Sequence, residues 1–293
     1  MRIGIGLPAA VPGTPGTAIA PWASEAERLG FRSLGVIDRL VYDNLDPLVA
    51  LAGAATRTER VELLTTVLNV PYRQNAVVLA KQLASVDQLS GGRLTAGLGL
   101  GGWPEDYAAS ELSLRGRGPA LEAMLATMRR AWAGELEGAG GPMPALAAGR
   151  PRVLLAGLIP AAFARAAALA EGWVSPAFGF ETFTEGVASV RRAWSDAGRP
   201  GRPRFVTARY FCLGDHADDR AGEYLEHYYG SEYLSAAMAD TLTSQGHLRE
   251  ELARLSAAGC DDLVLLPCSG ALDQVKRLAD ALDSNGAAFE LAA

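Results

Sequence analysis

The residues that could do chemistry in this chain gather where its expected strands end. Asp38-Arg39 follows one such strand, Glu105 and Asp106 follow another, and all three histidines of the chain lie in its last third. A hydrolase needs a nucleophile beside a base, and these strand ends offer no such pair. Their glycines, aromatic rings and small polar groups suit instead a flat bound cofactor that carries the chemistry itself.

A glycine-rich run follows the fourth expected strand. Gly97-Leu98-Gly99-Leu100-Gly101-Gly102 satisfies the G-x-G-x-x-G pattern of a dinucleotide-binding turn. Such a turn opens a helix, whereas Trp103-Pro104 follows here instead of a helix start, and Glu122, the acid about 20 residues on, lies within an expected helix. We therefore interpret the run as a strand end where missing side chains let a planar ligand approach the backbone.

Composition and charge disfavour several classes of protein. The chain has 293 residues and a formal net charge of -6, which provides no positive field for nucleic acid or a membrane surface. Its only lysines, Lys81 and Lys276, fall in expected helices, which argues against a Schiff-base aldolase, and no metal-ligand spacing is present. Cys212, Cys260 and Cys268 form no C-x-x-C pair. Without a long apolar stretch or a signal peptide, we expect a cytoplasmic protein.

Short apolar strands alternate with amphipathic helices along almost the whole chain, which indicates an α/β fold with a parallel sheet. The expected strands are residues 2–7, 33–37, 62–68, 94–98, 153–156, 172–175, 204–213 and 262–267. This alternation predicts one (β/α)8 TIM barrel over residues 1–293, and an open doubly wound sheet is the alternative. The active site is then expected at the C-terminal strand ends. Residues 230–246 are expected to be irregular and to cap the barrel mouth.

Several ordered blocks of sequence resemble the luciferase-like flavin-dependent oxidoreductases. The blocks are residues 48–52, 58–68, 71–75 and 80–93, the last containing Asp87-Gln88-Leu89-Ser90-Gly91-Gly92-Arg93, followed by residues 97–107 and 115–118. The resemblance continues more loosely through residues 155–157, 172–173 and 258–263. It implies a bacterial luciferase-like (β/α)8 barrel, in agreement with the strand pattern.

The resemblance also implies a cofactor at the barrel mouth, either reduced FMN or the deazaflavin coenzyme F420. In many members a non-proline cis peptide bond at the end of the third strand supports the ring, and the matching bond here is Thr66–Val67. This chain departs from the family pattern at four places. After the fifth strand, the family's glycine-rich phosphate loop is reduced to Gly157-Leu158-Ile159-Pro160. Arg39 replaces a frequent histidine, Leu100 replaces a phosphate-binding arginine of luciferase, and Gly102 replaces a glutamate of some deazaflavin enzymes.

The candidate site residues follow from these strand ends together with the resemblance. Asp38 and Arg39 are the candidate catalytic residues, with a loop cap and a surface ion pair as the plainer interpretations. The candidate cofactor-binding residues are Thr65, Thr66, Val67, Asn69, Leu100, Gly101, Gly157 and Leu158. The candidate substrate-binding residues are Pro8, Tyr42, Trp103 and Tyr107, although aromatic residues after a strand can equally serve packing.

The function that this resemblance implies is a reduced-FMN-dependent monooxygenase of a small organic substrate, acting through a C4a-peroxide. An F420-dependent hydride-transfer oxidoreductase of the same fold is one alternative. A family member that has lost its redox role and serves as a binding or partner subunit is another. We expect a homodimer that packs through the helices after the early strands, and a separate flavin reductase as a possible partner. We expect no nucleic acid, membrane or metal partner.

Overall fold

Parallel strands close into a barrel in this computed structural model, which describes residues 1–138, 141–142 and 150–283. The sheet has nine strands, of which β3 and β4 occupy one barrel position, so the barrel has eight positions. The strands are β1 (Arg2–Gly6), β2 (Ser33–Val36), β3 (Glu62–Thr65), β4 (Leu68–Asn69), β5 (Leu94–Gly99), β8 (Arg152–Ala156), β9 (Gly172–Val174), β10 (Arg204–Phe211) and β11 (Asp262–Pro267). β1 pairs with β2 and β11, and pairing of β3 with β5 closes the ring. The predicted (β/α)8 TIM barrel is confirmed.

Each predicted strand coincides with an observed one to within about two residues at its ends. One of them is interrupted, because β3 ends at Thr65 and β4 begins at Leu68. The peptide bond between Thr66 and Val67 is cis, as the resemblance implied. Thr66 and Val67, on either side of this bond, therefore lie between these two short strands.

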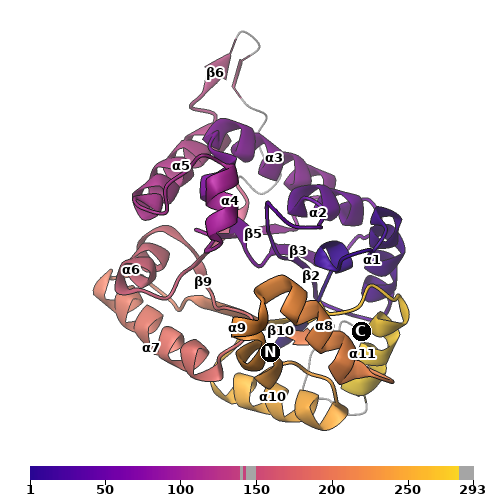
Figure 1. Cartoon of the computed structure of the whole chain (residues 1–293). Coiled ribbons are helices and arrows are strands. Elements are labelled where there is room, and N and C mark those ends of the chain that lie inside the picture. The colour runs from indigo at the N-terminus through magenta and orange to yellow at the C-terminus, as the bar shows by residue number, and fades with distance from the viewer. Residues whose placement is uncertain (139–140, 143–149, 284–293) are drawn as a thin grey trace.

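Helices surround the barrel, as Figure 1 shows. They are α1 (Ile19–Arg28), α2 (Pro47–Ala55), α3 (Ala76–Leu89), α4 (Pro104–Ala109), α5 (Arg117–Trp132), α6 (Pro160–Leu169), α7 (Phe180–Asp196), α8 (Ala217–Tyr229), α9 (Ser231–Ala239), α10 (Gln245–Ala257) and α11 (Asp273–Asp283). Asp46 and Asn75 cap α2 and α3 by accepting hydrogen bonds from first-turn amides. A short hairpin of β6 (Glu137–Gly138) and β7 (Gly141–Pro142) projects from the ring.

Two expectations about local structure are wrong. Trp103-Pro104 does open a helix, since α4 begins at Pro104, and proline at a first helical position is favourable because its missing N–H has no helical partner there. Residues 230–246 are not irregular, because α9 occupies most of the stretch and α10 begins at Gln245. α9 is hard to recognise from sequence because Ala237 is its only fully buried residue.

The core has an outer and an inner layer. On β10, Phe205 and Phe211 belong to the layer between strands and helices, whereas Val206, Ala208 and Tyr210 belong to the barrel interior. This alternation follows from the two-residue repeat of side chains along a strand. The inner cluster continues into the buried face of α8, so that this helix packs directly on the interior.

Ion pairs fill the N-terminal end of the barrel. Arg204, at the start of β10, binds Glu62 of β3 at 2.8 Å and Asp262 of β11 at 2.7 Å. Arg2 of β1 adds a contact of 2.6 Å to Asp262. Hydrogen bonds and positive charge from these arginines hold the pKa of Glu62 below its usual value, although burial opposes the shift. In (β/α)8 barrels the active site lies at the opposite, C-terminal end of the strands, so we expect the functional site there.

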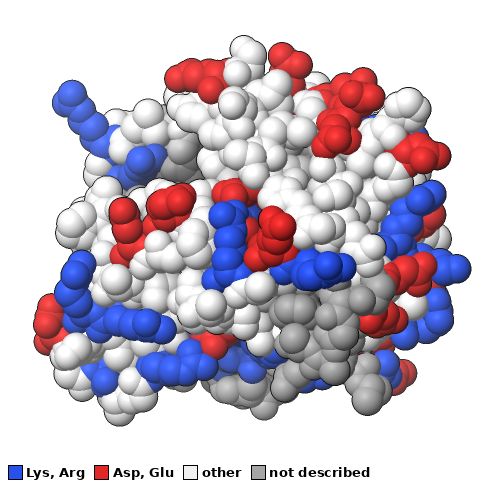
Figure 2. Space-filling view, turned by 90° about the horizontal axis from the view of Figure 1, so that it is seen from below, with Lys and Arg blue, Asp and Glu red and all other residues white. Residues whose placement is uncertain are grey.

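The outer surface carries both signs of charge. Figure 2 shows acidic and basic side chains close together across one face, in keeping with 27 basic and 33 acidic residues in the chain. None of the helices in the described ranges combines the length and the apolar character that crossing a membrane requires.

Candidate active site

The loop after β2 is joined to the segment after β3 by an exchange of hydrogen bonds. The backbone amide of Asn69 donates to Oδ2 of Asp38 at 2.8 Å, and the Asn69 side-chain amide donates to the Asp38 carbonyl oxygen at 2.9 Å. Arg73 lies 3.3 Å from the Asp38 carboxylate and 2.9 Å from Oδ2 of Asp46. The two predicted residues, Asp38 and Asn69, are thus in direct contact.

The carboxyl group of Asp38 is buried, and burial changes its pKa. Burial raises the pKa of Asp38 to about 6, although the positive charge of Arg73 and the hydrogen bond from the Asn69 amide lower it. Loss of hydration disfavours the charged form more than these partners favour it. Asp38 therefore gains or loses a proton close to neutral pH.

Arg39 is held by contacts on all sides. Its guanidinium lies 3.8 Å from the centre of the Trp103 ring, Nη2 donates to Glu105 at 2.6 Å, and Nε lies 3.3 Å from Asp106. Nη1 donates to the carbonyl oxygen of Tyr228, at the end of α8, at 3.3 Å. Only 4% of this side chain is exposed. Arg39 therefore joins the loops after β2 and β5 to α8, and a catalytic role for it stays a prediction.

Most of the predicted cofactor-binding residues gather at neighbouring strand ends. Thr66, Val67, Leu100, Gly101 and Gly157 are partly exposed at the ends of β3, β5 and β8. Leu158 is 48% exposed. Thr65 differs, because its side chain is fully buried and its hydroxyl donates to the Gly97 carbonyl oxygen at 2.6 Å. Cofactor contact by any of these residues stays a prediction.

Packing within the chain itself explains why glycine occurs at two positions at the end of β5 and just after it. A Cβ atom at Gly99 would lie 2.6 Å from Cγ2 of Val67, and one at Gly101 would lie 2.0 Å from the Tyr72 hydroxyl. Gly101 also has a φ of 70°, which favours glycine. The glycine run thus allows close packing of the β5 end against the segment after β3, which the sequence interpretation had assigned to ligand approach alone.

The start of α6 is open to an anionic group. No side chain caps this helix at Ile159, and Leu158 and Ile159 are 48% and 61% exposed. Gly157 has a φ of 137°, and its carbonyl oxygen accepts a hydrogen bond from Trp173 Nε1 at 2.9 Å. Helix N-termini attract anions through their unpaired amides and dipole. Arg117, at the start of α5, donates to the Gly101 carbonyl oxygen after β5 at 2.6 Å.

The predicted substrate-binding residues do not share one environment. Trp103 and Tyr42 are partly exposed in an aromatic cluster that includes Tyr228 and Tyr229 of α8. Tyr107 is 2% exposed and its hydroxyl donates to the Leu100 carbonyl oxygen, so it supports the loop after β5. Pro8 is buried at the end of β1. Substrate contact by these four residues stays a prediction.

Sequence reasoning missed the contribution of α8. Tyr228 and Tyr229 pack against Trp103 with ring centres 5.9 and 5.8 Å apart, and the Tyr229 hydroxyl lies 2.8 Å from that of Tyr210 inside the barrel. The run of tyrosines in this helix was visible in the sequence. The hydrogen bond from Arg39 to the Tyr228 carbonyl oxygen, across 189 positions, was not visible in the sequence.

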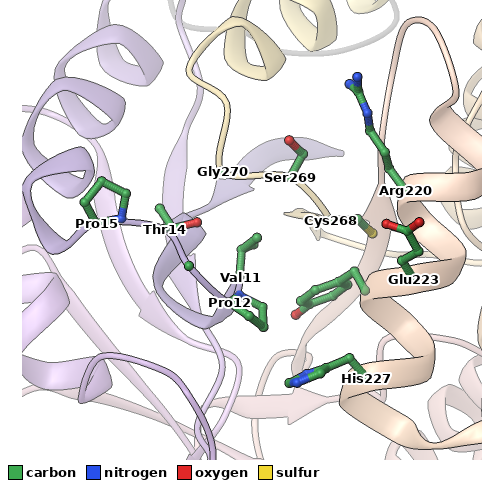
Figure 3. Close-up of a pocket in the computed structure, with 12 residues that line it drawn as sticks. Val11, Pro12, Thr14, Pro15, Arg220, Glu223, His227, Cys268, Ser269 and Gly270 are labelled. Carbon is green, nitrogen blue, oxygen red and sulfur yellow. The ribbon is translucent and has the colours of Figure 1, made fainter.

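A cavity of about 490 Å³ opens beside this cluster, between the loop after β1, α8 and the segment after β11. Figure 3 shows Glu223 and His227 projecting from α8 toward Val11 and Pro12, with Cys268 and Ser269 beside them. Nδ1 of His227 lies 2.8 Å from the Tyr42 hydroxyl, which connects the cavity wall to the aromatic cluster. The mouth thus has two adjoining regions, the strand ends of β3, β5 and β8 and this cavity.

The comparisons with known proteins agree with this architecture. The sequence profile described as luciferase-like monooxygenase matches residues 1–288, and the chain therefore belongs to that family. Its sequence is 28% identical over 218 residues to a 5,10-methylenetetrahydromethanopterin reductase of Methanolobus tindarius, covering 71% of this chain and 64% of the relative. The match thus spans somewhat less than two thirds of the relative's length.

Solved structures share the fold across the chain. The coenzyme F420-dependent tetrahydromethanopterin reductase from Methanopyrus kandleri superposes with a TM-score of 0.77 at 17% identity, covering 98% of this chain and all of the other. The oxygenating constituent of 3,6-diketocamphane monooxygenase from Pseudomonas putida, in complex with FMN, has a TM-score of 0.72 at 18% identity, covering 97% and 96%. Solved structures that share this fold thus include both an F420-dependent reductase and a monooxygenase.

Proposed function

We propose that the chain is a flavin-utilising oxidoreductase, specifically a reduced-FMN-dependent monooxygenase of a small organic substrate. The observation that carries this proposal is an apolar surface at neighbouring strand ends. Val67, Trp103, Ala156, Ala177 and Phe178 are partly exposed while they pack against the buried interior cluster. Such a surface suits one face of a planar ring, because burying it removes apolar area from water.

Polar groups beside this surface fit the remaining parts of the cofactor. The hydroxyl of Ser175, just after β9, is buried and has no hydrogen-bond partner among the residues that the structure describes. Polar edges of a bound ring would supply that partner. The uncapped start of α6 and Arg117 are where we expect the phosphate.

Asp38, after β2, is compatible with oxygenation. Bound reduced FMN supplies reactivity toward molecular oxygen. Asp38, with a pKa of about 6, can hold or release a proton at its carboxylate, and the aromatic cluster of Trp103, Tyr228 and Tyr229 excludes water from the mouth.

An F420-dependent hydride-transfer enzyme is the second candidate. It is supported by the superposition on the F420-dependent reductase and by Asp38, which could serve proton exchange in place of the absent histidine. A binding subunit without redox activity is the third candidate, suggested by Leu100 and Arg39 at positions where relatives carry other residues. For the monooxygenase we expect a separate flavin reductase to supply the reduced cofactor.

Anaerobic titration of the purified protein distinguishes these candidates. Reduced FMN, oxidised FMN and coenzyme F420 are added separately while fluorescence is followed. Preferential binding of reduced FMN, followed by oxygen-dependent product formation, is the expected result. Tight binding of F420 alone would replace the monooxygenase with the hydride-transfer enzyme. If none of the three binds, both enzymatic proposals fail and the binding subunit remains.

A further inference from the structure

The short segment between β9 and α7 carries Phe178, one of the residues of the proposed cofactor surface. Hydrogen bonds anchor this segment on both sides of that residue. Before it, the Thr207 hydroxyl of β10 donates to the Pro176 carbonyl oxygen at 3.0 Å. After it, the Gly179 amide donates to Oδ2 of Asp240 at 2.6 Å. The partly exposed ring of Phe178 is therefore held between two fixed points of the backbone.

Asp240, the second of these anchors, is itself held in place where α9 ends. Its Oδ1 atom accepts a hydrogen bond from Nη2 of Arg254 on α10. Two residues further on, the Leu242 amide donates to the Tyr210 carbonyl oxygen of β10 at 2.9 Å. Burial raises the pKa of Asp240, but the Gly179 amide and nearby arginine charges lower it more, so that the pKa lies below its usual value. The anchor is thus a charged carboxylate at neutral pH.

Arg254 belongs to a row of alternating charges that reaches from α10 to β10. Its Nε atom binds Glu251, and Glu251 binds Nε of Arg209 on β10 at 2.6 Å. The side chains of Glu251 and Arg209 are fully buried, and a buried charge is costly without its partner. Nη1 of Arg209 donates to the hydroxyl of Thr207 at 3.2 Å, and that hydroxyl holds Pro176. The row therefore connects the two anchors of the segment.

Contacts of the neighbouring rings fit the same arrangement. The Arg254 guanidinium lies 4.6 Å from the centre of the Phe180 ring, at the start of α7. The Phe178 ring packs edge to face against Tyr229, with ring centres 5.3 Å apart. Phe178 is thus held through its backbone on one side and through the aromatic cluster on the other.

We propose that Asp240 and Arg254 are positioning residues, which fix the segment after β9 so that the Phe178 ring forms one wall of the cofactor surface. That this surface holds a flavin ring rests on the proposed function, whereas the fixing of the segment does not. Both residues act through the Gly179 amide, without touching the cofactor themselves.

Hydrogen–deuterium exchange of the full chain without cofactor tests the fixing of the segment. Asp240→Ala removes the acceptor of the Gly179 amide, so residues 176–180 should exchange about tenfold faster. Asp240→Asn keeps an acceptor oxygen but loses the charge, so it should retain part of the protection. Asp273→Ala, which breaks an exposed pair with Arg277, is the control and should leave the segment unchanged. Unchanged exchange in Asp240→Ala, or an equal increase in the distant strands β1 and β2, would overturn the proposal.

Variants at Arg254 test its share of the effect. Arg254→Met removes the charge that holds Asp240 but leaves the acceptor of the Gly179 amide, so exchange in residues 176–180 should rise less than in Asp240→Ala. Arg254→Lys keeps the charge and should restore most of the protection. If Arg254→Met exchanged like the parent chain, Arg254 would have no positioning role.

Flavin titration tests whether the fixed segment serves the cofactor surface. Asp240→Ala should bind reduced FMN about tenfold more weakly, because a segment that is not preorganised must be ordered on binding. Reduced riboflavin should lose affinity by the same factor, since Phe178 is expected to contact the ring and not the phosphate. Phe178→Ala should have a similar effect, and the double variant should bind no more weakly than Phe178→Ala alone, because coupled residues are not additive. Additive losses would show that Asp240 does not act through Phe178 and would overturn the inference.

The two kinds of measurement separate this inference from the proposed function. If the parent chain bound neither flavin nor F420, the proposed function would fail, while the exchange data would still decide whether Asp240 and Arg254 fix the segment. If the parent chain bound flavin and Asp240→Ala bound it equally well, only this inference would fail.

Discussion

Asp38 and Asn69 bind each other in both directions, since the Asn69 amide donates to the Asp38 carboxylate and the Asn69 side chain donates to the Asp38 carbonyl oxygen. These bonds connect the loop after β2 to the short strand β4. They place a carboxylate with a raised pKa beside the proposed cofactor surface.

Burial of Asp38 should make the fold less stable as pH rises, which is opposite to the usual effect of a carboxyl group. Its pKa rises from 3.8 in the unfolded chain to about 6 in the fold, so the folded state holds more protons in that interval. Its contribution is therefore most favourable below pH 3.8 and is lost as pH rises through 6, by about 3 kcal/mol in total. Asp38→Asn should remove this component, so the difference in unfolding free energy between the two proteins should change between pH 4 and 7. Urea denaturation at several pH values measures it. Parallel pH profiles would contradict the prediction.

Sequence patterns predicted the barrel well and its mouth only in part. Strands such as β8 and β11 are recognisable because burial on both faces demands continuous apolar runs. Asp38 and Asn69 were identified because strand ends are known sites, but Arg73, which binds Asp38, was not. The covering of Arg39 by Trp103 and Tyr228 depends on how the loops after β2 and β5 meet α8. No local pattern encodes that meeting, because it arises from the closure of the whole barrel.

Arg39 should matter for stability and for the position of α8. Arg39→Met keeps much of the volume but leaves Asp106, which is fully buried, without its positive partner. Removing one partner of a buried ion pair costs about 3–5 kcal/mol, so we expect a loss in that range. The fluorescence of Trp103 should also change, because the guanidinium lies 3.8 Å from its ring. Arg28→Met, in an exposed pair with Glu25, is the control and should have little effect. A similarly small effect of Arg39→Met would refute the structural role.

The charge cluster at the N-terminal end of the barrel should stabilise the fold less as pH falls. The pKa of Glu62 is lowered by its arginine partners, so its stabilising contribution is present above the unfolded pKa and is lost as pH falls through the folded one. Glu62→Gln should destabilise the fold by about 3 kcal/mol at pH 7 and reduce its sensitivity to acid. Chemical denaturation at pH 7 and pH 4 measures both effects. Unchanged acid sensitivity would mean that other groups control it.

The expected homodimer can be tested on α2 and α3. Val49, Val77 and Val78 are 66%, 43% and 51% exposed on these helices, and Leu40 and Val41 nearby are each 50% exposed. Burial of such side chains between two copies would be favourable. A double variant, Val49→Glu with Val78→Glu, should be monomeric by sedimentation, while Leu272→Glu, at a site 46% exposed elsewhere, should leave the assembly unchanged. A monomeric parent protein would contradict the expectation at once.

The start of α6 offers a direct test of where the cofactor's phosphate lies. Leu158 is 48% exposed just before this uncapped helix, so Leu158→Asp adds a negative charge there with little expected change in packing. Because like charges repel at a helix N-terminus that would otherwise hold an anion, reduced FMN should bind about tenfold more weakly. Riboflavin has the same ring without the phosphate, and its binding should be nearly unchanged. Leu272→Asp, at an exposed position on another segment, controls for net charge. If Leu158→Asp weakened both flavins equally, the residue would contact the ring, and if it weakened neither, the phosphate would lie elsewhere.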